Sequence, residues 1–432
     1  MPGSKPSRWR PALAAIGLLA AISGCAYALI EDGVIREGPM REIVANTVRA
    51  RAIEPKGPIA ARTVNRDELR TVLAEAFGQW KTPAELANYE RALIALGLWP
   101  ADRDLYEEAL AIYGEAIVGV YLPTSRELLL VSDANAPRRL GILSAVLRRD
   151  FQTEFALSHE IIHWLQHQAY PELMDPDQVP TNSDDLETAI QAAIEGDALR
   201  FGFDAVGMQP PAPANWRVMI DGQMSGSEGS TLAEAPALIR LTLAFPYARG
   251  YALAWNEEFG LLESPPISTE QIMHDDRRRE AFLQLDLTEL EGRLPAGCRT
   301  LQRNTAGELL ISVLFRDLSE GPDPAIWEGW NGDRYLVADC EGRTEWVWWT
   351  AWDSASDAAE FADAYFERTS AVAARAGSAI PVSTQTEATY VVVTSRGFAD
   401  EASKPPPPAT RVADLASLQA LLRSSEKRAV LE

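Results

Sequence analysis

The sequence predicts an α+β protein with a mainly helical N-terminal domain, which carries a small edge β-hairpin or sheet, and a smaller C-terminal α+β domain. From residue 65 to about residue 259, apolar residues recur at helical spacing in successive stretches, with a single β-rich interruption. Beyond about Leu285, strand-type residues and aromatics take over, and six of the twelve tryptophans fall between Trp327 and Trp352. A chain of 432 residues is also too long for one ordinary core. Two domains with tails are therefore expected.

The N-terminus has the features of a secretion signal. Three basic residues, Lys5, Arg8 and Arg10, precede an apolar run that ends in Ile22-Ser23-Gly24-Cys25. This resembles a bacterial lipoprotein signal, in which residues 1–24 are removed and Cys25 is lipidated. Residues 11–30 are also uncharged and long enough to span a bilayer, so a retained signal anchor is the alternative. Both interpretations place the rest of the chain outside the cytoplasm, on a membrane facing the periplasm or at the cell surface.

The charge balance limits the partners. The formal net charge is −22, and such a surface repels nucleic acid and anionic lipid. The expected partners are therefore a peptide or protein substrate, and the membrane through the lipid on Cys25. The oligomeric state is not predicted. With Cys25 lipidated, Cys298 and Cys340 are the remaining thiols, and an oxidising compartment favours a disulfide between them. Two buried free thiols are the alternative.

The N-terminal domain is expected to span residues 61–284, after an irregular tether over residues 25–60. The β-rich interruption lies at 116–133, where two runs flank Pro123-Thr124-Ser125-Arg126, and this pattern predicts a hairpin. Gly, Pro and Ser are frequent from Gly202 to Ala233, which predicts a long loop or lid. Apolar residues at helical spacing predict helices over Asn65–Phe77, Thr82–Leu98, Asp102–Tyr113, Phe155–Tyr170, Asp184 to about Asp204, and Ala235 to about Phe259 with a kink at Pro246.

The C-terminal domain is expected to span residues 285–400. Its tryptophans alternate with β-type residues, which predicts an antiparallel sheet, and a helix over Ser356–Arg375 and a strand over Ala388–Thr394 follow. Aromatic clusters can stack on carbohydrate, but packing in the core of a small sheet is the more common role. In the last segment, residues 401–432, Lys404–Pro408 is expected to form a stiff linker to a short tail helix.

The predicted helix Phe155–Tyr170 contains an HExxH motif, formed by His159, Glu160 and His163. Residues four apart lie one turn above each other on a helix, so the two imidazoles can bind one metal ion. Glu160 points partly away from that face, which leaves its carboxylate free to act on a water molecule. The chain has only four histidines, and three of them lie within nine residues. His167, one turn further on, is expected to be exposed or to donate a hydrogen bond and not to bind the metal.

A catalytic zinc site needs a third protein ligand, commonly a carboxylate from a following helix. Glu195 suits this role because it lies in the small-residue context Ala193-Ile194-Glu195-Gly196-Asp197-Ala198, which allows close helix packing. Glu187 and Asp197 are the competing candidates. Asp197 is alternatively expected to orient a histidine ligand through a hydrogen bond.

Five motifs together resemble a family of extracytoplasmic zinc metallopeptidases of gluzincin type from bacteria and archaea. The resemblance covers roughly residues 65–400, and HExxH and EGDA are its specific motifs. It departs at Asp275-Asp276, where the family tends to have Pro and an acidic residue. The five motifs read HEIIHWLQHQ from His159, EGDA from Glu195, FPYARG from Phe245, STEQIMH from Ser268 and WNGDRY from Trp330.

The resemblance implies a zincin-like fold in which His159, His163 and Glu195 bind Zn²⁺ and Glu160 is the general base. It further implies that Tyr247, Tyr251 or His274 stabilises the oxyanion, because each lies in or beside a family motif and can donate a hydrogen bond. In zinc peptidases, an edge strand beside the active-site helix pairs with the substrate; residues 118–122 or 128–131 are the candidates here.

The function expected from these features is zinc-dependent hydrolysis in the cell envelope, most simply cleavage of peptide bonds. A non-catalytic surface or assembly module with the same fold is the main alternative. Hydrolysis of a non-peptide envelope amide is a third possibility, which the sequence does not distinguish from peptidase action.

The lipoprotein interpretation predicts that Cys25→Ser blocks lipidation, because the thiol is the acceptor. The cell-derived variant should then show an altered electrophoretic mobility and should not incorporate labelled fatty acid. If the parent protein itself incorporates no labelled fatty acid, the retained signal anchor becomes the better explanation.

Overall fold

The computed structural model describes most of the chain outside its N-terminus, and the predicted signal sequence with Cys25 lies outside the described residues. No helix in the described part of the chain is long and apolar enough to cross a membrane. The described residues are 29–132, 151–175, 178–180, 182–224, 231–257, 260–315, 323–376 and 383–431.

The protein is an α+β protein, and it divides into two compact units that interleave in sequence. Helices α3 (Arg66–Trp80) and α9 (Asp184–Ala205) each run from one unit into the other. The sequence predicts a single domain boundary near residue 284, whereas each of the two units consists of several separate segments of the chain. Unit 1 comprises Met1–Leu73, Gly114–Pro171 and Ala198–Pro210, and unit 2 comprises Ala74–Tyr113, Glu172–Asp197 and Pro211–Glu432.

Unit 1 contains the predicted hairpin. Strands β4 (Gly119–Leu122) and β5 (Glu127–Val131) pair antiparallel, as the sequence predicts. The sheet also has a third strand, β3 (Ala60–Val64), which pairs parallel to β5 and gives the order β3-β5-β4. Among the described strands, β4 therefore forms an edge of this sheet. A separate small hairpin joins β1 (Ile30–Glu31) to β2 (Val34–Ile35).

The predicted irregular tether is wrong over residues 37–51, which form helix α2 (Glu37–Arg51). The helix packs against α7 (Phe151–Ala169), which carries the HExxH motif. Its buried face consists of Ile43, Thr47 and Arg51. The Thr47 hydroxyl donates to the carbonyl of Ile43 at 2.8 Å, and the Arg51 guanidinium lies 4.9 Å from the ring centre of Phe201. Two of the three buried residues are polar, so the usual apolar helical pattern is missing from the sequence.

Unit 2 contains most of the remaining helices. The predicted loop over Gly202–Ala233 is wrong in part, because α9 continues to Ala205 and residues 213–224 form helix α10. Pro246 divides the last predicted helix, as expected, into two α-helices joined by a π-helix. The helices of this part of the chain are α4 (Pro83–Ala95), α5 (Leu105–Ala116), α8 (Pro171–Met174), α10 (Pro213–Met224), α11 (Ala237–Phe245), the π-helix η2 (Pro246–Gly250), α12 (Tyr251–Glu257) and α13 (Glu270–Met273).

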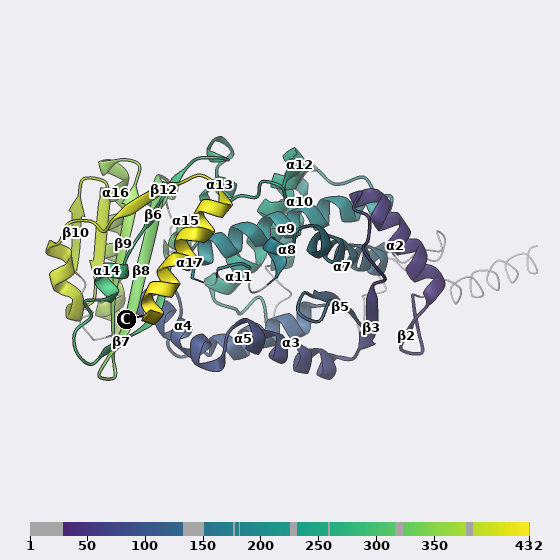
Figure 1. The fold of residues 1–432 in the computed structure, drawn as a ribbon, viewed down its shortest axis with the longest axis horizontal. Coiled ribbons are helices and arrows are strands. Elements are labelled where there is room, and N and C mark those ends of the chain that lie inside the picture. Colours follow the sequence, from purple (N-terminus) through teal and green to yellow (C-terminus); the bar gives the residue numbers. More distant parts are fainter. Residues whose placement is uncertain are drawn as a thin grey trace, which may run out of the picture. The chain divides into compact units, whose positions relative to one another are not determined.

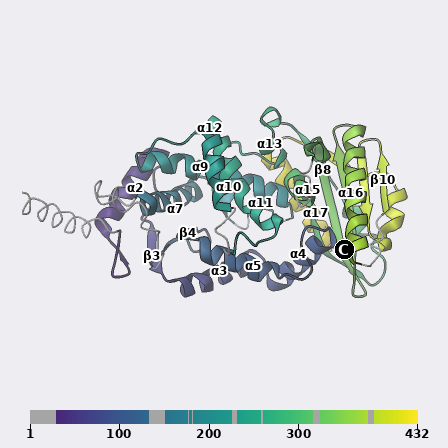
Figure 2. The same ribbon diagram turned by 180° about the vertical axis from the view of Figure 1, so that it is seen from behind.

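The C-terminal half of unit 2 is built on a five-stranded antiparallel sheet of order β10-β11-β9-β8-β7. Helix α16 (Ala355–Ala376) packs on this sheet, as Figures 1 and 2 show from opposite sides. Cys298 and Cys340 are directly opposite each other on β7 and β8 and form a disulfide bond. The strands are β7 (Cys298–Asn304), β8 (Trp330–Cys340), β9 (Arg343–Trp352), β10 (Ser383–Glu387) and β11 (Tyr390–Thr394).

The tryptophans of the sheet lie in the core on both of its faces. On β9, Trp348 contacts the aromatic rings of α16, whereas Trp349 belongs to the apolar cluster on the opposite face. All six tryptophans between 327 and 352 are buried, with exposed fractions of at most 6%. Because a strand sends successive side chains to opposite faces, a run of apolar residues indicates burial on both. These indoles therefore pack the core, which is the more common of the two expected roles.

The C-terminal segment is more than a linker and tail helix. After the prolines, strand β12 (Ala409–Val412) pairs antiparallel with β6 (Phe282–Leu285), and α17 (Leu415–Leu431) follows. The β12–β6 ladder crosses the boundary expected near residue 284. The sequence shows this poorly because β12 has only four residues and mainly exposed side chains.

One buried carboxylate organises the start of α15 (Gly307–Phe315). Asp333 accepts hydrogen bonds from the backbone N–H groups of Ala306 and Gly307 and from the indole N–H groups of Trp330 and Trp348. The four distances lie between 2.8 and 3.1 Å, and Asp333 is 1% exposed. The carboxylate therefore joins the N-terminus of a helix to two strands of the sheet.

We predict that Asp333→Ala lowers the free energy of unfolding by at least about 3 kcal/mol, because it leaves four buried donors without an acceptor. Denaturant unfolding of the full chain measures this. The exposed Asp323, which caps a short 3₁₀ helix, is the control, and its replacement by Ala should cost about 1 kcal/mol. Equal losses in the two variants would contradict the role assigned to Asp333.

Candidate metal centre

Helix α7 (Phe151–Ala169) places the HExxH motif in a buried environment. Leu157, Ile161 and Ile162 on this helix have no exposed surface. His159 and His163 are each 8% exposed, and their Nε2 atoms lie 3.0 Å apart. Two ring nitrogens this close need either a shared proton or a cation between them. The helix therefore presents its two imidazoles as a pair, as the four-residue spacing predicts.

The tautomer of His163 is set by a neighbour on the same helix. Its Nδ1 lies 2.8 Å from Oε1 of Gln166, and an amide oxygen is only an acceptor. His163 therefore donates from Nδ1, and in the neutral ring Nε2 keeps its lone pair for a metal or a proton. Gln166 has no exposed surface, so this hydrogen bond is protected from water.

Helix α9 (Asp184–Ala205) supplies the third candidate ligand. Beyond Ala198, this helix packs on α7, where Ile162, Ala198 and Phe201 form one apolar cluster. The rings of Phe155 and Phe203 extend the contact, with centres 4.7 Å apart. Glu195 lies on α9 one turn before Ala198. The ligand atoms of His159, His163 and Glu195 all lie within 4.8 Å of one another.

The donor set fits a zinc ion. Two imidazole nitrogens and one carboxylate oxygen are zinc ligands, and three protein ligands leave a fourth position open in catalytic sites. Zinc binds imidazole nitrogen at about 2.0–2.1 Å, which places two such nitrogens roughly 3.3 Å apart in a tetrahedral site. The 3.0 Å between His159 and His163 is close to that value. Neither Glu187 nor Asp197, the competing candidates, belongs to this group among the described residues.

Glu160 is held by the edge strand of unit 1. Its Oε2 accepts the backbone N–H of Tyr121, on β4, at 2.8 Å. The Tyr121 hydroxyl also lies 2.8 Å from Nδ1 of His167, so one strand residue contacts α7 at two points. His167 is 3% exposed, so it forms a hydrogen bond and is not exposed to solvent. The carboxylate of Glu160 is thus fixed beside the histidine pair without belonging to the ligand group.

Two of the sequence motifs contact each other through glycines. A Cβ atom on Gly196 would lie 2.0 Å from the carbonyl oxygen of Gly250, and a Cβ on Gly250 would lie 2.0 Å from that of Ala192. Any residue other than glycine would therefore push the π-helix η2 away from α9. The contacts with η2 involve Ala192 and Gly196, which lie on the turn of α9 that carries Glu195. The FPYARG motif thus fixes the position of the EGDA motif, and π-helices are frequent at functional sites.

The STEQIMH motif anchors the N-terminal end of α9. The backbone N–H and hydroxyl of Thr269 both donate to Oδ1 of Asp185, at 2.8 and 2.6 Å. Asn304 bonds Asp184 twice, through its side-chain oxygen and its side-chain nitrogen. These groups are buried. These hydrogen bonds fix the rotation of α9 about its axis and the position of its N-terminal end. They therefore also influence the direction in which the Glu195 side chain points.

The three predicted oxyanion donors, Tyr247, Tyr251 and His274, have different hydrogen-bond partners in the structure. Tyr251 is fully buried and donates its hydroxyl to the carbonyl of Pro211 at 2.7 Å, which indicates a structural role. Tyr247 lies on η2, and its carbonyl accepts the indole N–H of Trp216. His274 lies 2.7 Å from Oε1 of the buried Glu308, and this hydrogen bond raises the pKa of His274. Catalytic roles for Tyr247 and His274 remain predictions.

Asp197, predicted to orient a histidine ligand, lies two residues after Glu195 and has no exposed surface. Its position on α9, next to the turn that carries the ligand, is compatible with that role. The role remains a prediction.

A cavity of about 250 Å³ in unit 2 extends along the face of α9 that leads to Glu195. Asp184, Glu187, Thr188 and Gln191 line it at helical spacing, and Glu195 is the next residue on that face. Its other walls are mainly apolar and aromatic; they include Phe77, Leu93, Tyr106, Tyr113, Leu238 and Leu310. Burial raises the pKa of Glu187 to about 8, although the charge of Lys81 opposes the shift.

Sequence reasoning missed Tyr113, Tyr121 and Gln166. Burial and the nearby charge of Glu195 raise the pKa of Tyr113 to about 12, which makes its hydroxyl a weaker acid than that of an ordinary tyrosine. No motif marks these residues. Tyr121 could have been suspected, because it lies on the predicted strand beside the metal helix. Gln166 lies three residues after His163, a spacing at which helical side chains meet.

One comparison with known proteins gave a match. A family model described as a domain of unknown function (DUF8575) matches residues 295–404, which covers most of the predicted C-terminal domain. The comparisons with curated proteins and with solved structures found no match.

We predict that Gly196→Ala lowers the free energy of unfolding by about 1–3 kcal/mol or more and weakens metal binding, because the methyl group displaces η2 from α9. Gly78→Ala is the control, because a Cβ there meets nothing within 4 Å and should stabilise helix α3 by about 0.5–1 kcal/mol. Denaturant unfolding and metal titration measure the two effects. A Gly196→Ala variant that matches the parent in both would show that the close approach is not required.

Proposed function

We propose that this protein is a zinc-dependent hydrolase of the cell envelope with a zincin-like site, most simply a metallopeptidase. The observation that carries the proposal is the convergence of His159, His163 and Glu195, with Glu160 held beside them by strand β4. A structural zinc site is normally closed by four protein ligands, whereas three ligands and an adjacent carboxylate suit catalysis.

A bound zinc ion supplies Lewis acidity, which polarises a carbonyl group and makes a water molecule more acidic. The chain supplies the proton transfers and the positioning. Glu160 takes the proton of the attacking water and later donates it to the leaving amine. The hydrogen bond from the Tyr121 N–H to Oε2 fixes that carboxylate and stabilises its charged form, which is the form that acts as a base.

Strand β4 offers a place for an extended substrate. It is an edge strand, and the backbone N–H of Tyr121 points away from β5, toward Glu160. Because Glu160 already accepts that N–H, a peptide would pair with the other outward backbone groups of β4 and would pass next to the general base. Gly119, two residues earlier, has no side chain to block the approach, and a Cβ there would lie 3.4 Å from Cγ of Glu160. Of the two candidate segments, residues 118–122 are favoured, because β5 is paired on both sides.

The disulfide between Cys298 and Cys340 supports a location outside the cytoplasm, where such bonds persist. Together with the lipoprotein-like N-terminus, it favours an enzyme attached to a membrane that acts on peptide or protein substrates in the envelope.

The assigned roles predict opposite effects on zinc binding for two Glu→Gln variants, each of which keeps the size of the side chain and removes its charge. Glu160→Gln removes the base but no ligand, so zinc occupancy should stay near that of the parent while hydrolysis falls by ~10²- to 10⁴-fold. Glu195→Gln replaces an anionic ligand by a neutral amide, so zinc occupancy itself should fall. Mass spectrometry of the metal content and cleavage of a peptide library measure the two quantities.

His163→Ala is the reference for a lost ligand and should bind little zinc. The proposal fails if Glu160→Gln cleaves peptides as fast as the parent, or if Glu195→Gln holds zinc equally well. Full zinc occupancy without cleavage of any peptide by the parent would favour the non-catalytic module.

A further inference from the structure

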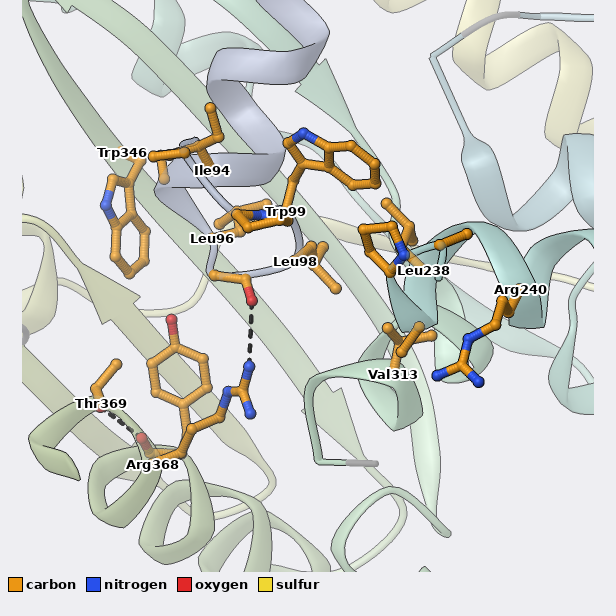
Figure 3. A pocket seen from close by; sticks show the side chains of 18 residues that line it. Ile94, Leu96, Leu98, Trp99, Leu238, Arg240, Val313, Trp346, Arg368 and Thr369 are labelled. Carbon is orange, nitrogen blue, oxygen red and sulfur yellow. Dashed lines mark hydrogen bonds between the residues drawn. The ribbon is translucent and has the colours of Figure 1, made fainter. Parts of the chain in front are cut away.

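Unit 2 contains a second and larger cavity, of about 510 Å³, and no candidate metal ligand is among the described residues that line it. Figure 3 shows it from close by, with Ile94 to Trp99 on one side, Leu238, Arg240 and Val313 on another, and Trp346, Arg368 and Thr369 on a third. These residues come from the end of α4 and the loop after it, the start of α11, α15, β9 and α16.

The walls of this cavity are mainly apolar. Leu96, Leu98, Trp99, Leu238 and Trp346 are buried apolar side chains that contribute to them. Cavities of roughly 300–1,000 Å³ with apolar and aromatic walls are typical of small-molecule sites. The volume and the lining therefore suit a ligand with an apolar body.

The charge of the wall is opposite to that of the chain. Arg240 and Arg368 line the cavity, and none of the described lining residues is an Asp or Glu, although the chain carries a net charge of −22. The Nε of Arg240 is buried and has no hydrogen-bond partner among the described residues. The Nε–H is therefore a buried donor without an acceptor, which costs free energy, although the side chain as a whole is only partly buried. Arginine also stays charged in proteins. An anionic group in the cavity would remove that cost.

A helix N-terminus adds to the positive potential at the same place. Helix α11 begins at Ala237, and its first turn has no side-chain cap. Residues 235–238 and Arg240 line the cavity together. Uncapped N–H groups at a helix start favour an anion, and here they lie on the same turn as an arginine that lacks a partner at Nε.

We propose that this cavity binds an anionic amphiphile, a molecule with one anionic head and an apolar chain. The head lies at Arg240 and the start of α11, and the chain lies along Trp99 and Leu98. Besides the two arginines, the polar side chains of the wall are Tyr365, Thr369 and the indoles of Trp99 and Trp346. The Thr369 hydroxyl and the Trp99 N–H already donate to backbone carbonyls, so few groups are left to replace the water that a peptide backbone would lose. A carboxylate and a phosphate head share the required chemistry.

The test compares ligands of equal chain length on the full-length parent protein. Dodecanoate and dodecyl phosphate, titrated below their micellar concentrations and followed by calorimetry, should bind at least roughly tenfold more tightly than 1-dodecanol, because each supplies a charge-assisted hydrogen bond. The tighter of the two anions identifies the head. Dodecyltrimethylammonium should bind more weakly than either. Equal affinity for dodecanoate and 1-dodecanol, or tighter binding of a short apolar peptide with a free C-terminus, overturns the proposal.

The matched variants are Arg240→Gln and Arg343→Gln, which remove the same charge from the cavity and from an exposed position on β9. Arg240→Gln should weaken dodecanoate roughly tenfold or more and leave 1-dodecanol unchanged. Arg343→Gln should change neither. Equal weakening by both variants indicates a general charge effect and contradicts the site. Binding is measured without catalysis on both metal-free and zinc-loaded protein, so its outcome is independent of the proposed hydrolase activity.

Discussion

The close packing of α9 is the constraint on which the candidate metal centre depends. The helix contacts η2 through Gly196 and Gly250, where backbone touches backbone, and it contacts α7 through Ala198 and Phe201. The contact with η2 depends on glycine, because a Cβ on Gly196 would lie 2.0 Å from the carbonyl oxygen of Gly250 and would push the two helices apart. Glu195 lies within the segment of α9 that contacts η2, between Ala192 and Gly196, and three residues before Ala198. The contact with η2 therefore holds the turn of α9 that carries Glu195.

The motifs that carry no obvious chemistry have structural roles around the same helix. Thr269 of the STEQIMH segment bonds Asp185 at the start of α9, and Asn304 bonds the neighbouring Asp184. Asp333 of the WNGDRY segment fixes residues 306–307 at the start of α15, and Gly307 packs against Asp185. Buried hydrogen bonds of this kind are costly to break because each donor loses its acceptor. The polar core of unit 2 thus determines where α9 begins.

Acidic and basic groups are distributed unevenly in unit 2. The cavity that leads toward Glu195 is lined by Asp184 and Glu187, whereas the larger cavity is lined by Arg240 and Arg368 and by no described acid. Leu238 contributes to the walls of both. Helix α11 therefore contributes to the walls of both the acid-lined and the arginine-lined cavity. In an acidic chain, this absence of described acids around two arginines is the reason for proposing an anionic ligand in the larger cavity.

The sequence by itself determined the local features: the helix that carries HExxH, the hairpin before it, the break at Pro246 and the buried tryptophan-rich sheet. Each follows from periodicity, from proline or from alternation along a strand, which are properties of neighbouring residues. It also singled out Glu195 by its small neighbours. Only the tertiary structure decided what depends on distant contacts, namely helix α2, whose buried face is partly polar, the β12–β6 pairing, the hydrogen bond from Tyr121 to Glu160, and the cavity at Arg240. These features join residues far apart in the chain, and no local pattern encodes such contacts.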